Sequence, residues 1–475
     1  MTSISLAQPP TEVSATGPPI DGPKGPDVLG SLLSSVAARL EELEIPHAFL
    51  RGHLDLPRVR LGSDVDLLVP RRERRRFERL LEEACLKFGA SVWQRFEAGF
   101  LTQYQLHIRT PEGSHEFLSV DLHTSEACFG VPFLEPADLL PDVPTTGGMR
   151  TAHADVGALA NFLGPYLSGG LVREDYALAL AKSLADDARR LAPLLASLFG
   201  ERLASEISDG LAAHDFDGLE ALARRARRNL LARRLLRAPL RSIGGLLSFG
   251  FGTRLRPLWR PRGLFLVFLG TDGSGKSTVL EALERRLAPA FRSAQSGTWH
   301  LRPKVLPQLD SVVHLGRSTY TIEDMSRPHR AKPSGPLLSN LRVAYYWLDY
   351  VVGYALKILP RRRRQSLIIF DRYFYDYLVD PLRCRVRRDT LLTRVLARWV
   401  PRPDKVIVIS AELERVRARK QELSVEESAF QIDAYEALAA SEPGYCLVRN
   451  DGTVEESVQS VLDHVFGETS EAGAA

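Results

Sequence analysis

One stretch of the sequence has the residue types and the spacing that bind a nucleoside triphosphate. Residues 263–278 read GLFLVFLGTDGSGKST, and the pattern G-x-x-x-x-G-K-[ST] is matched by Gly270, Gly275, Lys276 and Ser277. Glycines in such a loop let backbone N–H groups turn inward and surround phosphate oxygens. We expect the ammonium group of Lys276 to contact the β- and γ-phosphates and the hydroxyl of Ser277 to ligate Mg²⁺. A Gly/Ser-rich turn that matches by chance is the alternative.

The sequence on both sides of this motif supplies the elements that would position it. Phe265–Leu269 is an apolar run of strand length, and Thr278 opens a segment with helical spacing. Strand, glycine loop and helix in this order are the context in which the motif binds phosphate. Four more strands are predicted downstream, at 296–302, 366–370, 405–410 and 444–453. Their alternation with helical patterns predicts an α/β domain with a parallel sheet and helices on both faces.

A second set of residues that could do chemistry lies nearer the N-terminus. Asp64 and Asp66 alternate at the start of a predicted strand, so both carboxylates point to the same side. Asp121 lies in the second arm of a predicted hairpin formed by 101–110 and 116–124. Three acids on adjacent strands could hold one or two Mg²⁺ ions and activate an attacking oxygen at the α-phosphate of a nucleoside triphosphate. A polar strand end and a surface acid are the alternative.

The composition limits the class of protein. A chain of 475 residues has room for about three domains. Its net charge of +4 does not predict nucleic-acid binding, and we expect no nucleic-acid partner. The four cysteines are far apart, which argues against a disulfide scaffold or a zinc site and for a reducing compartment. We find neither the pattern of a secretory signal nor an apolar run of about 18 residues, so we expect a cytoplasmic protein.

Composition and spacing divide the chain into five regions. They are a disordered tail at 1–26, a small α+β domain at 27–145, a helical region with a linker at 146–262, the α/β domain at 263–468 and a tail at 469–475. The N-terminal tail is rich in Pro, Gly, Ser and Thr and has little apolar surface to bury. The prolines and the glycine of 257–263 mark the linker.

The helical region is rich in arginine. Between Arg224 and Arg262 there are twelve arginines and no acid. Such a surface could contact anionic lipid, nucleic acid or the phosphates of a nucleotide. A solvated helix face, on which arginine stems cover apolar surface, has the same composition. We favour the solvated face because charge runs are common on exposed helices, and we keep peripheral membrane contact as the alternative.

The C-terminal half resembles the thymidylate kinases. The segment 268–278 (FLGTDGSGKST) resembles their first signature, and 368–373 (IIFDRY) resembles their D-R-[YHFW] segment. Pro403 and Asp404 match the P-D that precedes their fourth strand, and 414–423 resembles their arginine-bearing LID. The resemblance covers about residues 263–468 and implies a P-loop kinase that uses ATP and Mg²⁺. It also implies which residues bind the nucleotide: Gly270, Asp272, Gly273, Ser274, Gly275, Lys276, Ser277, Thr278 and Asn450, the last at the adenine edge.

The same resemblance implies catalytic roles. Arg372 would bind the phosphate of the acceptor, and Asp371 would position Mg²⁺ or that arginine. Asp272 would meet the sugar or phosphate region of the acceptor. Arg417 and Arg419, in the LID-like segment, would close on the transferred phosphoryl group and, together with the P-loop lysine, neutralise its charge.

Two departures from the family concern the acceptor. The T-R-E-P-G-G run after the second strand is reduced to 299–303 (WHLRP), and the S-x-x-A-Y-Q run that reads thymine is replaced by 374–380 (FYDYLVD). The ATP half therefore matches and the base-reading half does not. We expect a small-molecule phosphate acceptor, a nucleoside monophosphate or a sugar derivative, and do not restrict it to dTMP.

The N-terminal acids resemble a different family. Gly52, the run 62–69 (GSDVDLLV) and 120–122 (VDL) resemble the nucleotidyltransferase superfamily of DNA polymerase β, over roughly residues 45–130. The resemblance implies that Asp64, Asp66 and Asp121 are catalytic metal ligands.

Three functions follow from these patterns. The first is phosphoryl transfer of the thymidylate kinase type. The second is nucleotidyl transfer at the N-terminal acids, which would make the chain bifunctional. The third is a regulatory module that binds ATP and has lost its acceptor site. The sequence does not determine whether the chain is an oligomer.

Overall fold

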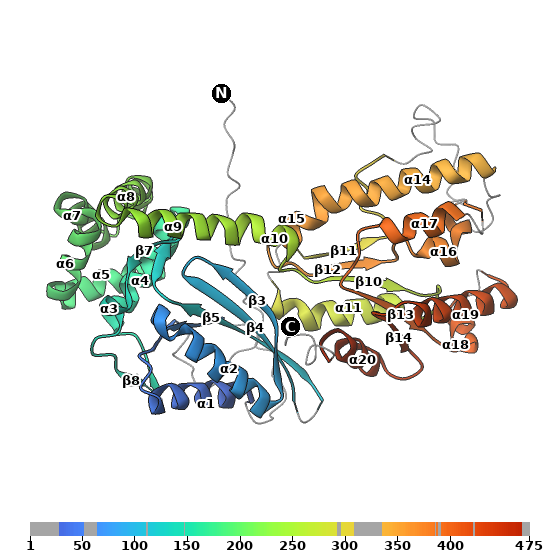
Figure 1. Cartoon of the computed structure of the whole chain (residues 1–475), viewed down its shortest axis with the longest axis horizontal. Coiled ribbons are helices and arrows are strands. Elements are labelled where there is room, and N and C mark those ends of the chain that lie inside the picture. The colour runs from blue at the N-terminus through green and yellow to red at the C-terminus, as the bar shows by residue number, and fades with distance from the viewer. Residues whose placement is uncertain are drawn as a thin grey trace. The chain divides into compact units, whose positions relative to one another are not determined.

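The computed structural model describes residues 28–51, 64–110, 113–146, 148–291, 296–307, 335–384, 386–387, 391–420 and 423–467. The chain divides into two compact units, with the boundary between Pro257 and Leu258; both are shown in Figure 1. The tails expected at 1–26 and 469–475 lie outside the described residues, as do Gly52 and most of the stretch before Asp64. No described helix is both long and apolar enough to cross a membrane.

The first unit contains a mixed five-stranded sheet. Its order is β1 (Ala48–Arg51), β2 (Asp64–Leu68), β5 (His115–His123), β4 (Leu101–Arg109) and β3 (Ala90–Ala98). Only the β2–β5 pair is parallel. Helices α1 (Val28–Glu42) and α2 (Arg74–Phe88) bury apolar side chains together with those of β2, β4 and β5 in one core. The predicted hairpin is confirmed, whereas β3 was not predicted, because most of this edge strand is only half-buried.

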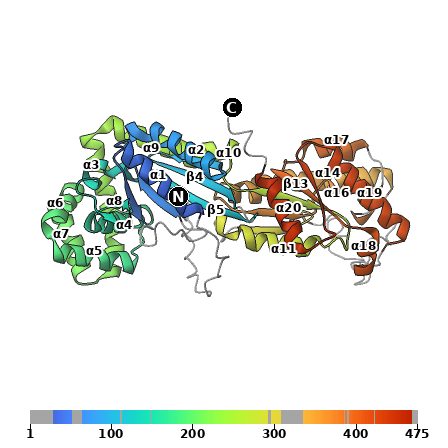
Figure 2. The same ribbon diagram turned by 90° about the horizontal axis from the view of Figure 1, so that it is seen from below.

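The helices that follow belong to the same unit. They are α4 (Ala154–Gly169), α5 (Glu174–Asp186), α6 (Ala188–Phe199), α7 (Glu201–Ala212), α8 (Phe216–Arg237) and α9 (Pro239–Gly250), and Figure 2 shows them beside the sheet. The sequence analysis divided this part of the chain at 145/146. The structure instead builds one core from both sides of that point, since Leu50, Leu68 and Phe133 pack with the apolar faces of the helices.

The second unit is built on a parallel sheet. Its order is β11 (Gly297–His300), β12 (Ile368–Asp371), β10 (Phe265–Leu269), β13 (Lys405–Ser410) and β14 (Tyr445–Arg449). All four neighbouring pairs are parallel, which confirms the predicted parallel sheet and its five strands. Every residue of the central strand β10 is buried, as expected for a strand covered on both faces.

Helices cover both faces of this sheet. Figure 1 shows α14 (Pro336–Gly353), α16 (Asp376–Val379) and α17 (Leu391–Trp399) on one face and α11 (Lys276–Leu287) and α20 (Val454–Phe466) on the other. The core under α14 joins its Val343 and Tyr350 to Phe265 and Phe370 of the sheet. The helix α19 (Val425–Ser441) packs on β13 and β14. This arrangement leaves the carboxyl ends of the strands for the glycine loop.

Candidate functional site

The glycine loop joins the carboxyl end of β10 to the first turn of α11. Gly270, Gly273 and Gly275 all have positive φ, at 141°, 91° and 85°. A Cβ on Gly270 would lie 2.2 Å from the carbonyl oxygen of Ile409, and one on Gly275 would lie 2.2 Å from the side-chain nitrogen of Asn450. The loop conformation therefore requires glycine for two reasons, the backbone angle and the close approach of neighbouring atoms.

The side chain of Asn450 hydrogen-bonds the backbone of the glycine loop. Its side chain is 3 % exposed. Its Nδ2 donates to the carbonyl oxygen of Ser274 at 2.8 Å, and its Oδ1 accepts from the hydroxyl of Ser457 at 2.9 Å. Both ends of the amide are thus engaged by the protein. The amide of Asn450 therefore supports the loop, while its expected contact with the adenine edge stays a prediction.

Lys276 lies buried at the centre of the site. Its ammonium nitrogen is 3.6 Å from Oδ1 of Asp371 and 3.5 Å from the carbonyl oxygen of Gly270. Burial, and then the nearby charge of Arg372, lower the pKa of Lys276 to about 8. A phosphate bound here would reverse that effect, because a buried cation gains most from an anion placed beside it.

Asp371 is the last residue of β12, the strand next to β10. Burial by itself would raise the pKa of its carboxyl group. The hydrogen bond with Nδ1 of His300, 3.1 Å away, and the charge of Lys276 outweigh burial and lower that pKa. Asp371 therefore stays ionised beside the P-loop lysine, where a carboxylate can orient a cation or ligate Mg²⁺.

Arg372 is the most constrained residue of the site. Its φ is 71°, an angle that a residue with a side chain keeps only where its surroundings fix it. Its side chain is 2 % exposed and pairs with Asp272 and with Asp376, the latter at 2.9 Å. It also donates to the hydroxyl of Tyr435 at 3.1 Å. Burial opposes the charged form, but the two carboxylates hold the pKa of Arg372 well above its usual value.

The carboxylate of Asp272, in the glycine loop, pairs with three cationic side chains. Besides Arg372, Nη2 of Arg383 lies 2.7 Å and Nζ of Lys420 lies 3.5 Å from its carboxylate. Burial would raise the pKa of Asp272, but the charges of Arg372 and Arg383 outweigh it and lower that pKa strongly. Arg383 is oriented in turn by Asp380, 3.1 Å from its Nε. The expected position of Asp272 beside an acceptor pocket remains a prediction.

Several of these residues were not assigned a role from the sequence: Asp376, Asp380, Arg383 and Tyr435. One signal was present. Arg372, Asp376 and Asp380 are four residues apart, which is the spacing that brings side chains together on a helical turn. Arg383 continues this spacing, three residues after Asp380, whereas Tyr435 is joined to the site only by tertiary packing, so no local pattern identifies it.

The two arginines of α18 (Leu413–Arg419) are placed differently. Nη1 of Arg419 lies 3.4 Å from the carbonyl oxygen of Gly273, so this arginine reaches the glycine loop. Nη1 of Arg417 instead donates to the carbonyl oxygen of Leu423 at 3.3 Å. Of the two arginines expected to act on the transferred group, the structure brings only Arg419 to the loop, while the role of Arg417 stays a prediction.

The residues present fit a triphosphate with Mg²⁺. The hydroxyls of Thr271 and Ser274 are buried and have no hydrogen-bond partner among the described residues, whereas buried polar groups normally find one. Ser277 and Thr278 are exposed on the first turn of α11. The described residues contain no cluster of three or more His, Cys, Asp or Glu arranged to hold a metal. Mg²⁺ that also binds phosphates needs only one or two protein ligands, for which Ser277 and Asp371 are available.

The N-terminal acids lie together on the first sheet. Asp66 of β2 is directly opposite Asp121 of β5, and Asp64 is opposite Ser119. Burial, and then the charges of Asp64 and Asp66, raise the pKa of Asp121 to about 6. His123 lies 2.8 Å from Asp66 through its Nε2. The structure therefore brings the three acids together, while metal binding by them stays a prediction.

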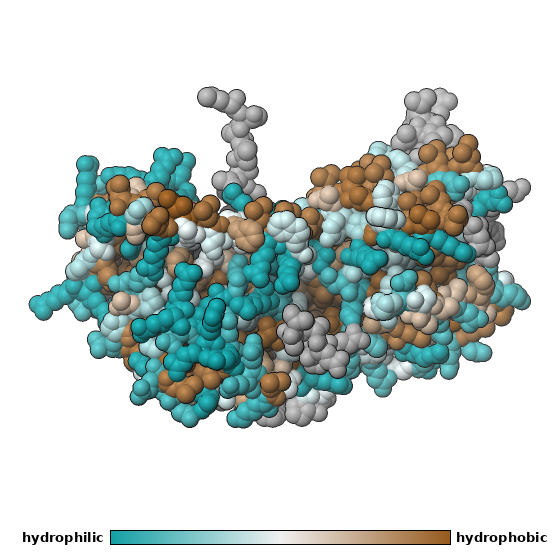
Figure 3. All heavy atoms as spheres, viewed as in Figure 1, coloured by the Kyte–Doolittle hydropathy of each residue, from teal (hydrophilic) through white to brown (hydrophobic). Residues whose placement is uncertain are grey.

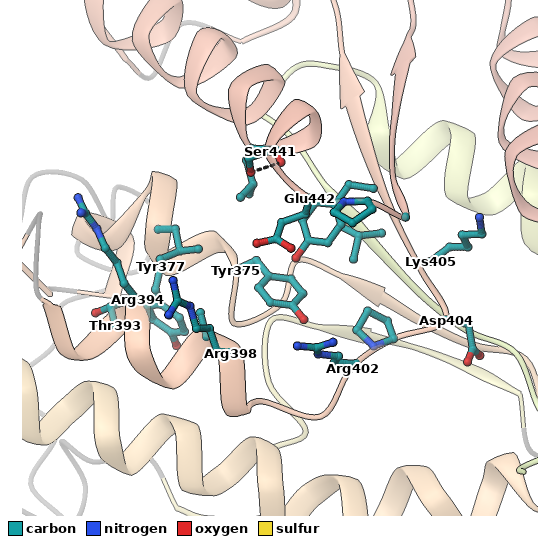
Figure 4. A pocket seen from close by; sticks show the side chains of 18 of the residues that line it. Tyr375, Tyr377, Thr393, Arg394, Arg398, Arg402, Asp404, Lys405, Ser441 and Glu442 are labelled. Atoms are coloured by element: carbon teal, nitrogen blue, oxygen red, sulfur yellow. Dashed lines mark hydrogen bonds between the residues drawn. The ribbon is translucent and has the colours of Figure 1, made fainter. Parts of the chain in front are cut away.

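A cavity of about 450 Å³ lies elsewhere in the second unit (Figure 4). Its lining includes Lys405 and Tyr445, the first residues of β13 and β14. It is therefore at the amino ends of the strands, the edge of the sheet opposite the glycine loop. Arg398 and Arg402 also line it. No sequence pattern had indicated this cavity.

Comparison with known proteins finds no matching family profile and no matching curated protein. Among solved structures, the thymidylate kinase from Ehrlichia chaffeensis matches 43% of this chain and 98% of its own, with 16% identity and a TM-score of 0.30. That from Candida albicans matches 44% of this chain and 93% of its own, with 19% identity and a TM-score of 0.32. TM-scores this low do not indicate a shared activity. The function is therefore inferred from the residues of the site.

Proposed function

We propose that this protein transfers a phosphoryl group from ATP to a small-molecule acceptor that carries a phosphate or a hydroxyl group. The observation that supports this is the position of Lys276, buried in a glycine loop at the carboxyl end of a parallel strand. Its ammonium group lies 3.6 Å from Asp371 on the neighbouring strand. Ligands of parallel α/β sheets bind at this edge, and phosphoryl transfer needs positioned positive charge there.

The donor side of the site is formed by the chain's own groups. Bound ATP would supply the phosphoryl group and Mg²⁺ would neutralise part of its charge. The backbone N–H groups of the loop would hold the phosphates, and Lys276 and Arg419 would stabilise the transferred group. Asp371 keeps Lys276 oriented through the short distance between their charged atoms.

The acceptor side is suggested by the cations around Asp272. Arg372 is buried and pairs with Asp272 and Asp376, so we infer that it orients Asp272, while its expected contact with the acceptor phosphate stays a prediction. Arg383 and Lys420 are more accessible, with side chains 14% and 42% exposed. A phosphate on the acceptor would compete with Asp272 for these two cations. A nucleoside monophosphate or a sugar phosphate meets this requirement.

The test is an acceptor screen with the full chain, Mg²⁺ and ATP, in which ADP is measured. One acceptor should stimulate ADP formation, and Lys276→Ala should reduce the stimulated rate by at least about 100-fold, because a lost charge stabilisation at the transferred group has this order of magnitude. The exposed Lys182 provides the control, since Lys182→Ala should leave the rate unchanged. Unchanged ADP formation in Lys276→Ala would contradict the proposal. Tight ATP binding without any product would favour a regulatory module.

One observation supports nucleotidyl transfer as a second candidate function. Asp66 of β2 lies opposite Asp121 of β5, and Asp64 lies on the same side of β2 as Asp66, so the three carboxylates face one space. Pyrophosphate release from a nucleoside triphosphate would support this activity if Asp66→Ala abolishes it and the exposed Asp217→Ala does not. Release that persists in Asp66→Ala would exclude the three acids as its source.

A further inference from the structure

Helix α9 carries its large apolar side chains on the solvent side. Leu240, Ile243, Leu247 and Phe251 are 87%, 45%, 69% and 53% exposed. Their spacing of i, i+3, i+7 and i+11 places them on one face of the helix, with Phe251 in the π-helical turn that continues α9. These four residues are called the outer row below. Figure 3 shows apolar side chains gathered along this upper edge of the first unit.

The opposite face of the same helix is made of small residues. Ser242, Gly245 and Gly252 are buried. A Cβ on Gly245 would lie 1.9 Å from the carbonyl oxygen of Gly130, and one on Gly252 would lie 2.4 Å from that of Glu97. The backbone of the helix therefore lies directly against β3 and against the turn that contains Gly130. This is the reverse of an ordinary surface helix, which turns its large apolar residues to the core.

Packing of the first unit does not account for the outer row. Single exposed leucines are common on proteins, but four along one helical face form a continuous apolar strip, which is typical of a binding surface. Leu236, 85% exposed at the end of α8, lies just before it.

The charges around the outer row indicate what would cover it. Arg237, Arg241 and Arg254 are exposed close to it in sequence, and no acid occurs between Arg224 and Arg262. Arg241 pairs with Glu135 at 2.8 Å, whereas Arg254 has no ion pair among the described residues. An apolar strip with cations beside it, in a segment that contains no acid, matches an anionic lipid surface, into which such a helix inserts by about 5–10 Å.

We propose that α9 is a peripheral membrane-binding element, with the outer row inserted among the headgroups of an anionic bilayer and the flanking arginines on lipid phosphates. This membrane-binding surface is smaller than the arginine-rich region between Arg224 and Arg262 that the sequence indicated. Many arginines of α8 are held by the protein itself: Arg225 pairs with Glu206, and Arg234 donates to the carbonyl oxygen of Phe133. The apolar strip, rather than the arginine count, distinguishes α9.

The test is co-sedimentation of the full chain with vesicles of phosphatidylcholine alone or with about a third phosphatidylglycerol. We expect binding to the anionic vesicles at least about tenfold stronger than to the neutral ones, and weakened by salt. The double variant Leu240→Gln, Leu247→Gln should lose at least about tenfold of that binding, because both side chains are exposed and their apolar surface drives insertion. Leu171→Gln with Leu178→Gln, which changes two exposed leucines elsewhere in the unit, is the matched control and should bind like the wild type.

Three results would overturn the proposal. They are absence of binding to anionic vesicles, equal loss in both double variants, and binding that is unchanged in the outer-row variant. A concentration-dependent dimer that the outer-row variant abolishes, with no vesicle binding, would assign the strip to a second copy of the chain instead. Far-UV circular dichroism and the urea unfolding of each variant report whether its first unit is folded, since the substituted leucines all lie in that unit.

Discussion

Replacement of Asn450 by alanine tests how the glycine loop is held. The change removes the 2.8 Å hydrogen bond to the carbonyl oxygen of Ser274 and the 2.9 Å bond from Ser457. Two such bonds contribute about 1 kcal/mol each, and a buried carbonyl left unpaired adds to the cost. We therefore expect the binding-competent loop to lose about 2–3 kcal/mol, which corresponds to a loss of triphosphate affinity of about 30- to 150-fold.

The assay compares the binding of ATP with that of tripolyphosphate, which has no base. If Asn450 supports the loop, Asn450→Ala weakens both ligands by the same factor. Ser457→Ala is the matched control, because it removes only the bond at the far end of the amide and should cost less than about fivefold. A loss confined to ATP would show that Asn450 contacts the adenine, and an unchanged affinity for both ligands would refute its role in the loop.

Three further predictions concern buried charges. Because the pKa of Lys276 is lowered to about 8, ATP binding at pH 8.5 should take up a proton, and calorimetry in two buffers of different ionisation enthalpy measures it; no uptake would contradict the burial argument. Asp376→Asn should destabilise the second unit by about 3–5 kcal/mol in urea unfolding, because it leaves the buried Arg372 short of a carboxylate; a change below about 1 kcal/mol would contradict this. Burial, and then the charge of His115, lower the pKa of His107 to about 3, so between pH 6.5 and 3 the unfolded chain binds a proton that the folded chain does not. The stability of the first unit should therefore fall as the pH drops from about 6.5 towards 3. In His107→Phe this part of the pH dependence should disappear.

The donor half of the site could be predicted from local sequence. The glycines, Lys276 and Ser277 are contiguous, and strand–loop–helix order is a short-range property that hydrophobic spacing reveals. The five strands of the second unit were found for the same reason, since each is a short apolar run between turn residues. That Asp64 and Asp66 lie on the same side of one strand was also expected from alternation, whereas the parallel pairing that sets Asp66 opposite Asp121 is a tertiary contact.

The acceptor half and the role of Asn450 could not be predicted in this way. The amide of Asn450 reaches Ser274 across 176 positions of the chain, and Arg383 reaches Asp272 across 111. Such contacts depend on how helices pack on the sheet, which spacing along the chain does not encode. The core that Leu68 shares with Leu159, which lie on opposite sides of the boundary predicted at 145/146, has no local signature for the same reason.

The sequence by itself determined that this protein has a glycine loop with a lysine at the end of a buried strand, because the motif and its flanks are contiguous. Only the tertiary structure decided that Arg372 is buried, since two carboxylates and a tyrosine from three separate segments surround its guanidinium group. It likewise decided that the outer row of α9 faces solvent. The composition of α9 alone does not determine which of its faces is buried. The close contacts of Gly245 with Gly130 and of Gly252 with Glu97 determine it.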